Sequence, residues 1–96
     1  MLRLMIVDDE QIIREALSSM IDYNSLGYEV IATAKNGMEA YDRICDDYPD
    51  VVITDIKMPI LNGLELIERS SRTDSRITFI LLSGYSDFEY ARQAMK

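Results

Sequence analysis

The chain has no histidine, a single cysteine and no long apolar run in its 96 residues. Zinc and other soft metals are held mainly by histidine and cysteine, so a soft-metal site is not expected. The lone Cys45 cannot form an internal disulfide, and we interpret it as a small buried side chain in a reducing compartment. The opening MLRLMIV is too short for a signal peptide or a membrane-spanning helix, which predicts a cytoplasmic protein starting at its native first residue.

Basic residues are also scarce, with 10 lysines and arginines against 17 aspartates and glutamates and a net charge of −7. A phosphate backbone or an anionic membrane would be repelled, so neither nucleic acid nor membrane is an expected partner of this segment. The 48% of apolar and 28% of charged residues are typical of a folded domain rather than a disordered chain. At this length, residues 1–96 are expected to form one small domain.

Apolar runs alternate along the chain with segments whose apolar residues recur at helical spacing. Strands are predicted for residues 4–7, 29–34, 51–54 and 77–82, and each is followed by a predicted helix. Strands separated by helical crossovers run parallel, and their continuous apolar character suits a sheet that is covered on both faces. The order therefore predicts an α/β fold with a doubly wound parallel sheet built from four βα units.

Capping and breaking residues mark the expected ends of the helices. Gly27 in NSLG is expected to stop the first helix, and Asn36 is expected to cap the start of the second. Pro49 should end the second helix. The pair Ser86 and Glu89 forms a capping box that should open a fourth helix.

Oxygen-bearing side chains follow three of the predicted strands: Asp8 and Asp9 the first, Asp55 the third and Ser83 the fourth. In parallel sheets of this kind the binding crevice lies at the carboxyl ends of the strands. Carboxylates gathered there repel one another, and an oxygen-only set suits a hard cation such as Mg²⁺. The alternative is that these acids only decorate loops and helix N-termini, where negative charge is favourable in itself.

Asp55 differs from the paired acids because it stands alone between Thr54 and Ile56. A carboxylate beside Mg²⁺ can attack a phosphoryl group and form an acyl phosphate, while the cation offsets the charge on the transferring group. Ser83 could donate a hydrogen bond to a phosphoryl oxygen, or it could simply cap the end of its strand.

Three stretches, IVDDE, VVITDIKMPILNGLEL and ILLSGYSDFEYARQAMK, resemble the receiver domain of two-component response regulators. The acidic pair, the Asp-x-x-Met-Pro-x-x-x-Gly loop and the Ser-Gly after the fourth strand match in order and spacing, and the resemblance covers the whole chain. The stretch GYSDFEYA also resembles receivers that precede an AraC-type DNA-binding domain. The family implies a flavodoxin-like receiver fold with the strand order 2-1-3-4.

The resemblance also implies roles for individual residues. Asp55 matches the phosphoacceptor, and Asp9 and Asp55 match the side-chain ligands of Mg²⁺. Asp8 belongs to the acidic pocket and usually acts through water, and the carbonyl of Lys57 matches the remaining protein ligand. Ser83 matches the switch hydroxyl that turns toward the phosphoryl group.

The same family implies that a sensor histidine kinase supplies the phosphoryl group in trans, in agreement with the absence of histidine here. Lys57 and Tyr85 fall at positions that tune how fast the aspartyl phosphate hydrolyses. The chain is then expected to be a phosphorylation-controlled receiver and not a turnover enzyme. Its state would be relayed to an output domain that regulates transcription.

Receivers have five βα units, and the fifth, with its lysine that contacts the phosphoryl group, has no counterpart in this sequence. We therefore expect residues 1–96 to be a receiver domain truncated at its C-terminal end. The strand at 77–82 then becomes an apolar edge, which predicts self-association of the chain. Two other functions stay open: a Mg²⁺-dependent phosphotransferase or phosphatase, and a phosphorylation-independent interaction module with a vestigial acidic pocket. Lys57 weighs against the first, because such enzymes usually place a second acid two residues after the nucleophile.

Overall fold

Strands and helices alternate in the predicted order in the computed structural model, which describes residues 1–73 and 76–82. The strands are β1 (Leu2–Val7), β2 (Tyr28–Ala34), β3 (Val51–Asp55) and β4 (Thr78–Leu82). The helices are α1 (Gln11–Met20), α2 (Gly37–Asp47) and α3 (Gly63–Thr73), with a short 3₁₀ helix, η1 (Asn24–Leu26), before β2. The expected fourth helix and its capping box lie outside the described residues.

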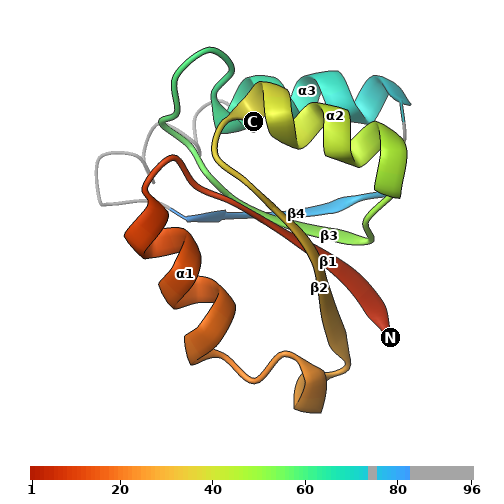
Figure 1. Cartoon of the computed structure of the whole chain (residues 1–96). Helices are drawn as coiled ribbons and strands as arrows, with labels where there is room; N and C mark the ends of the chain where they lie inside the picture. Colours follow the sequence, from red (N-terminus) through yellow and green to blue (C-terminus); the bar gives the residue numbers. More distant parts are fainter. Residues whose placement is uncertain (74–75, 83–96) are drawn as a thin grey trace.

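The four strands form one parallel sheet with the order β2-β1-β3-β4, which confirms the predicted topology (Figure 1). In its register, Val7 at the end of β1 lies opposite Ala34 of β2 and Thr54 of β3. Asp55 lies opposite Leu82 at the end of β4. The carboxyl ends of all four strands therefore meet at one edge of the sheet, where the sequence places its acidic residues.

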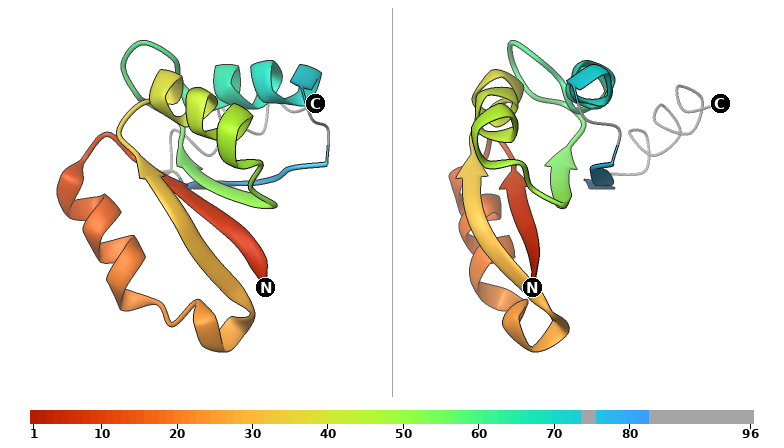
Figure 2. Two further views of the ribbon diagram at one scale, coloured as in Figure 1. Left: turned by 45° about the vertical axis from the view of Figure 1, so that its right-hand side comes forward. Right: turned by 90° about the vertical axis from the view of Figure 1, so that its right-hand side faces the viewer.

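Helices α2 and α3 cover one face of the sheet and α1 lies on the other, as Figures 1 and 2 show. The sheet separates two layers of apolar side chains. Successive residues of a strand point to opposite faces, so Met5 and Val7 enter one layer while Leu4 and Ile6 enter the other. The α2/α3 layer comprises Met5, Val7, Ala34, Ala40, Ile44, Val52, Met58, Leu61 and Leu66. The α1 layer comprises Leu4, Ile6, Tyr23, Val51 and Ile53.

The α1 face is the less completely covered of the two. No residue of α1 is buried, and Ile80 on β4 is 47% exposed. An apolar groove of about 230 Å³ runs along this face and is lined by Leu4, Ile21, Tyr23, Leu26, Tyr28, Val51, Ile53 and Ile80. Among the strands that the structure describes, β4 is an edge strand, as predicted.

The end of the first helix differs from the prediction. Helix α1 stops at Met20, and Gly27, with a φ of 90°, ends the separate helix η1 instead. Between them Tyr23 is buried, and its hydroxyl donates a hydrogen bond to the carbonyl of Leu17 at 2.6 Å. Ile21 has an extended backbone, so the chain leaves the helical path after Met20. The ring of Tyr23 then packs in the α1 layer of the sheet.

The boundaries of the second helix match the prediction. The side chain of Asn36 accepts a hydrogen bond from the N–H of Glu39 at 2.8 Å, which caps the start of α2. The helix ends at Asp47, and Tyr48 turns the chain with a φ of 49° before Pro49.

No helix within residues 1–73 or 76–82 is long and apolar enough to cross a membrane.

Candidate metal centre

Asp8 follows β1 directly and is held in place by three neighbours. It is only 4% exposed, and its N–H donates to the carbonyl of Ala34 at 3.1 Å. Its carboxylate accepts a hydrogen bond from the N–H of Glu10 at 2.9 Å. Its own carbonyl accepts one from the guanidinium of Arg14 at 2.8 Å. The turn between β1 and α1 is therefore fixed by hydrogen bonds at both the main chain and the side chain of Asp8.

The pKa of Asp8 is raised above its ordinary value of 3.8, mainly because burial disfavours the ionised carboxylate. The hydrogen bond from the N–H of Glu10 and the charge of Arg14 act in the opposite direction, while the neighbouring charge of Asp9 raises the pKa further. A carboxylate in this position is stabilised by any cation that replaces the lost hydration.

Three carboxylates gather at the end of β1. Ligand oxygens of Asp8, Asp9 and Glu10 all lie within 4.8 Å of one another. The donor set consists only of oxygen, and Asp9 and Glu10 are exposed, so a hydrated cation can reach it. These properties fit Mg²⁺, which binds to a few carboxylates while keeping several of its waters. The sequence prediction included Asp8 and Asp9 but not Glu10, although its place directly after the pair was a usable signal.

Asp55 is the last residue of β3, which lies beside β1 in the sheet. It is half-buried, and its Oδ1 accepts a hydrogen bond from the N–H of Ile56 at 2.7 Å. The buried hydroxyl of Thr54 donates to the carbonyl of Asp55 at 2.9 Å. Asp55 thus lies at the same sheet edge as the three acids but is not part of the group within 4.8 Å. Ser83 lies outside the described residues.

The loop that follows Asp55 alternates between buried and exposed side chains. Ile56, Met58 and Leu61 are buried, whereas Lys57 is exposed. Ile60 has a φ of 74°, and the residues on either side of it are joined by a hydrogen bond from the N–H of Leu61 to the carbonyl of Pro59 at 2.8 Å. This geometry is a γ-turn with a positive central φ, a strained conformation that is rare for a β-branched residue. The loop therefore has a defined conformation that is held by its buried side chains.

Gly63 closes the loop against the main chain of Asp55. Its N–H donates to the carbonyl of Ile56 at 2.8 Å. A Cβ at this position would overlap the carbonyl oxygen of Asp55 and would lie 3.2 Å from its carbonyl carbon. Only glycine allows α3 to begin this close to the end of β3. The glycine of the Asp-x-x-Met-Pro-x-x-x-Gly pattern thus has a packing role directly behind Asp55.

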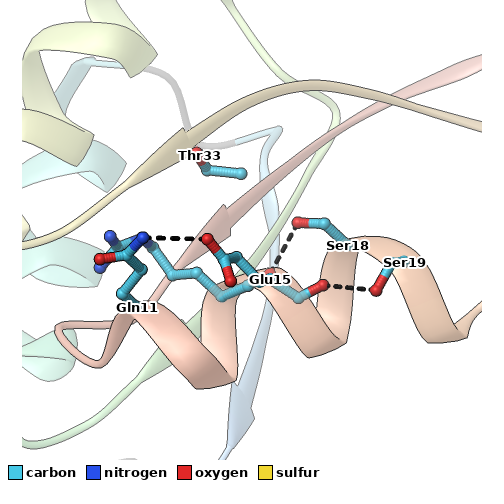
Figure 3. Close-up of a pocket in the computed structure, with 6 residues that line it drawn as sticks. Gln11, Glu15, Ser18, Ser19 and Thr33 are labelled. Carbon is cyan, nitrogen blue, oxygen red and sulfur yellow. Dashed lines mark hydrogen bonds between the residues drawn. The ribbon is translucent and has the colours of Figure 1, made fainter.

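A polar groove of about 390 Å³ lies between α1 and β2, beside this edge (Figure 3). It is lined by Gln11, Arg14, Glu15, Ser18, Ser19 and Thr33. The hydroxyls of Ser18 and Ser19 each donate to a main-chain carbonyl one turn earlier at 2.7 Å, and the amide of Gln11 donates to the carboxylate of Glu15 at 2.9 Å. These groups already bond within α1, so the groove adds no ligand to the acidic cluster.

Comparison with known proteins gives a consistent result. Residues 4–96 match the family described as the response regulator receiver domain. The chain is 46% identical over its whole length to the transcriptional regulatory protein YesN of Bacillus subtilis, and 41% identical to the transcriptional regulatory protein HptR of Staphylococcus aureus. It covers 26% of the first and 37% of the second, so it spans well under half the length of either relative.

Solved structures show the same fold. The receiver domain of the response regulator AraT from Geobacillus stearothermophilus superposes with a TM-score of 0.91 and 36% identity. The two-component transcriptional regulator AraC from Clostridium phytofermentans superposes with a TM-score of 0.93 and 35% identity. The match covers 98% and 100% of this chain, and 73% and 74% of those chains. The fold of the described residues is therefore that of receiver domains with a solved structure.

Proposed function

The chain belongs to the family of response regulator receiver domains, and from that premise we propose that Asp55 accepts a phosphoryl group in a Mg²⁺-dependent reaction. The observation that carries the proposal is the shared sheet edge. Val7 and Thr54 are register partners, so the residues that follow them, Asp8 and Asp55, leave neighbouring strands at the same level. Receiver domains are signalling modules, and the proposed reaction changes the state of the protein itself rather than turning over a substrate.

The proposed donor is a phosphohistidine of a sensor kinase. A carboxylate oxygen of Asp55 attacks phosphorus, the P–N bond breaks, and the imidazole leaves with the bonding electron pair and takes up a proton. The product on this chain is an acyl phosphate. The N–H of Ile56 holds one carboxylate oxygen at 2.7 Å and the hydroxyl of Thr54 holds the main-chain carbonyl, so the orientation of Asp55 is fixed before the reaction.

Mg²⁺ would be held by the carboxylates of Asp9 and Asp55 and by the carbonyl of Lys57, with Asp8 acting through water. Its contribution is to offset the negative charge that develops on the transferring group. Support comes from the clustered oxygen ligands of Asp8, Asp9 and Glu10 and from the raised pKa of Asp8, whose largest cause is burial. Asp9 is exposed and can meet the metal with little rearrangement of the fold.

Ser83 is proposed as the switch hydroxyl that donates to the phosphoryl group, and Tyr85 as a residue that tunes hydrolysis of the acyl phosphate. The relay to an output domain is also a proposal, supported by the transcriptional regulatory proteins among the relatives. A cytoplasmic location and an AraC-type output domain stay predictions of the same kind.

A small phosphodonor such as acetyl phosphate tests the proposal without the kinase. With Mg²⁺ present, the chain should gain one phosphoryl group by intact mass, and Asp55→Asn should not. Asp42→Asn is the matched control, because it removes an exposed carboxylate from α2, away from the acidic edge. Equal labelling of Asp55→Asn and the parent would exclude Asp55 as the acceptor.

A phosphorylation-independent interaction module remains the second candidate. The observation in its favour is that Asp55 is not part of the carboxylate group within 4.8 Å. A Mg²⁺ titration separates the two functions, since a vestigial pocket should not bind the cation in the parent. A receiver should bind it, and Asp9→Ala should remove most of that binding while the protein stays folded.

A further inference from the structure

Helix α2 lies against the loop after Asp55 at a buried glycine. Gly37 is the first residue of α2, and it lies against the main chain of Leu61. A Cβ at Gly37 would overlap the carbonyl oxygen of Leu61 and would lie 2.7 Å from its Cβ and 2.8 Å from its carbonyl carbon. Real Cβ atoms essentially never approach other heavy atoms within 3.0 Å. Because the obstructing atoms are mostly main chain, any side chain at this position displaces either the helix or the loop.

The helix is the more firmly fixed of the two. The side chain of Asn36 caps it by accepting the N–H of Glu39 at 2.8 Å. Ala40 and Ile44, on the same side of the helix as Gly37, are at most 1% exposed and pack into the α2/α3 layer. Moving α2 away from the loop would open this layer along its length, so a local shift of the loop costs less.

The loop transmits such a shift toward the site. Leu61 and Met58 are both buried in the same apolar layer, and Gly63 is bonded to the carbonyl of Ile56 at 2.8 Å. Lys57 lies between the buried Ile56 and Met58. The loop is held at its two ends by the hydrogen bond between Ile56 and Gly63. If Leu61 is displaced, the residues between these ends, including Lys57, therefore have to move.

We propose that Gly37 is a positioning residue for the candidate metal centre: by leaving room for the carbonyl of Leu61, it fixes the loop whose Lys57 carbonyl and adjoining Asp55 serve the site. The inference rests on the proposed function, because it concerns the same Mg²⁺ ligands. Gly37 itself touches neither metal nor substrate. Its effect is exerted through the loop, and a displacement of about 1 Å in a site of this kind can cost about 100-fold in rate.

The test compares Gly37→Ala with the parent 96-residue chain. Two quantities are measured: the Mg²⁺ dissociation constant of the folded protein, from metal-dependent amide shifts in NMR spectra, and the initial rate of phosphorylation by acetyl phosphate. Gly37→Ala should raise the dissociation constant at least about tenfold and lower the rate by a similar or larger factor.

Gly27→Ala is the matched control for loss of stability. Gly27 has a φ of 90°, so alanine is strained there, but it has no heavy atom within 4 Å of its would-be Cβ. It lies between η1 and β2, at the amino-terminal edge of the sheet. This variant should lose thermal stability while its Mg²⁺ affinity and phosphorylation rate stay those of the parent.

A second pair of variants decides the matter if Gly37→Ala does not fold. Leu61→Ala removes the side chain that anchors the loop, and Leu66→Ala removes one of the same size from α3 in the same apolar layer. Both should lower the melting temperature, and by comparable amounts. Only Leu61→Ala should weaken Mg²⁺ binding and slow phosphorylation.

Each outcome has a definite meaning. If the parent binds Mg²⁺ and is phosphorylated, and the Gly37 and Leu61 variants behave as their controls do, the positioning role is wrong and the proposed function stands. If the parent itself neither binds Mg²⁺ nor accepts a phosphoryl group, the proposed function fails, and the role of Gly37 fails with it.

Discussion

Ser70 on α3 carries a buried hydroxyl without a hydrogen-bond partner among the residues that the structure describes. A buried polar group left unpaired costs about 1–3 kcal/mol of stability. Replacing serine by alanine in a helix interior adds up to about 0.5 kcal/mol of helix propensity. Since the removed oxygen leaves only a small void, Ser70→Ala should raise the free energy of unfolding by about 1–3 kcal/mol. For a domain of this size, each 1 kcal/mol raises the melting temperature by about 4–8 °C.

The neighbouring Ser71 provides a control in the same helix. It is exposed, and its hydroxyl donates to the carbonyl of Glu68 at 2.8 Å. Ser71→Ala makes the same chemical change without relieving a buried unpaired group, so its stability should stay within about 0.5 kcal/mol of the parent. Urea unfolding followed by far-UV circular dichroism measures both variants. A Ser70→Ala protein that is no more stable than Ser71→Ala would show that the buried hydroxyl carries no penalty.

Three further predictions follow from single residues. Ile60→Gly should raise the free energy of unfolding, measured in urea, by about 0.5–1 kcal/mol. The positive φ of this mostly exposed isoleucine costs about 1–2 kcal/mol, and the greater freedom of glycine in the unfolded chain offsets only part of that gain. Ile60→Ala should show no such gain. Burial raises the pKa of Asp8, so ionisation of its carboxyl group destabilises the fold as the pH rises from 3.8 through the raised pKa. Without metal, Asp8→Asn should therefore be more stable than the parent at neutral pH. In a pH series this gain in stability should vanish below pH 3.8. Ile80→Lys on the exposed edge strand should shift the chain from dimer toward monomer in sedimentation, and a parent that stays a compact monomer at high concentration would contradict the predicted self-association.

The strands and the helix starts could be predicted because they depend on local patterns. The apolar runs give the strands, and Asn36 is followed by a helix whose first turn it caps in the structure. The end of α1 could not be predicted in the same way. Gly27 does stop a helix, but a separate one, since the burial of Tyr23 breaks the path between them. That burial is a tertiary effect that no local pattern reports.

The candidate site was likewise predictable from the sequence only in part. Asp8, Asp9 and Asp55 could be placed at one edge because parallel strands end together. The distances between their carboxylates depend on side-chain conformation. The place of Glu10 after the acidic pair suggested its inclusion, and the structure supplied the distances that put it in the close group. The close contacts of Gly37 also required coordinates, because a glycine at a helix start is read from sequence only as a small residue.

Several features that cost stability or restrict substitution lie at the carboxyl edge of the sheet. Asp8 is buried with a raised pKa, Ile60 occupies a strained γ-turn, and Gly63 leaves no room for a side chain behind Asp55. At the opposite edge, Gly27 has a positive φ with open space around it, and Tyr48 after α2 has a positive φ as well. Strain persists only where the surrounding structure imposes it, and it is typical of sites whose geometry must be held for binding. A cation bound at this edge would offset the repulsion between the clustered carboxylates. The same cluster would therefore raise the affinity for the metal and lower the stability of the metal-free domain.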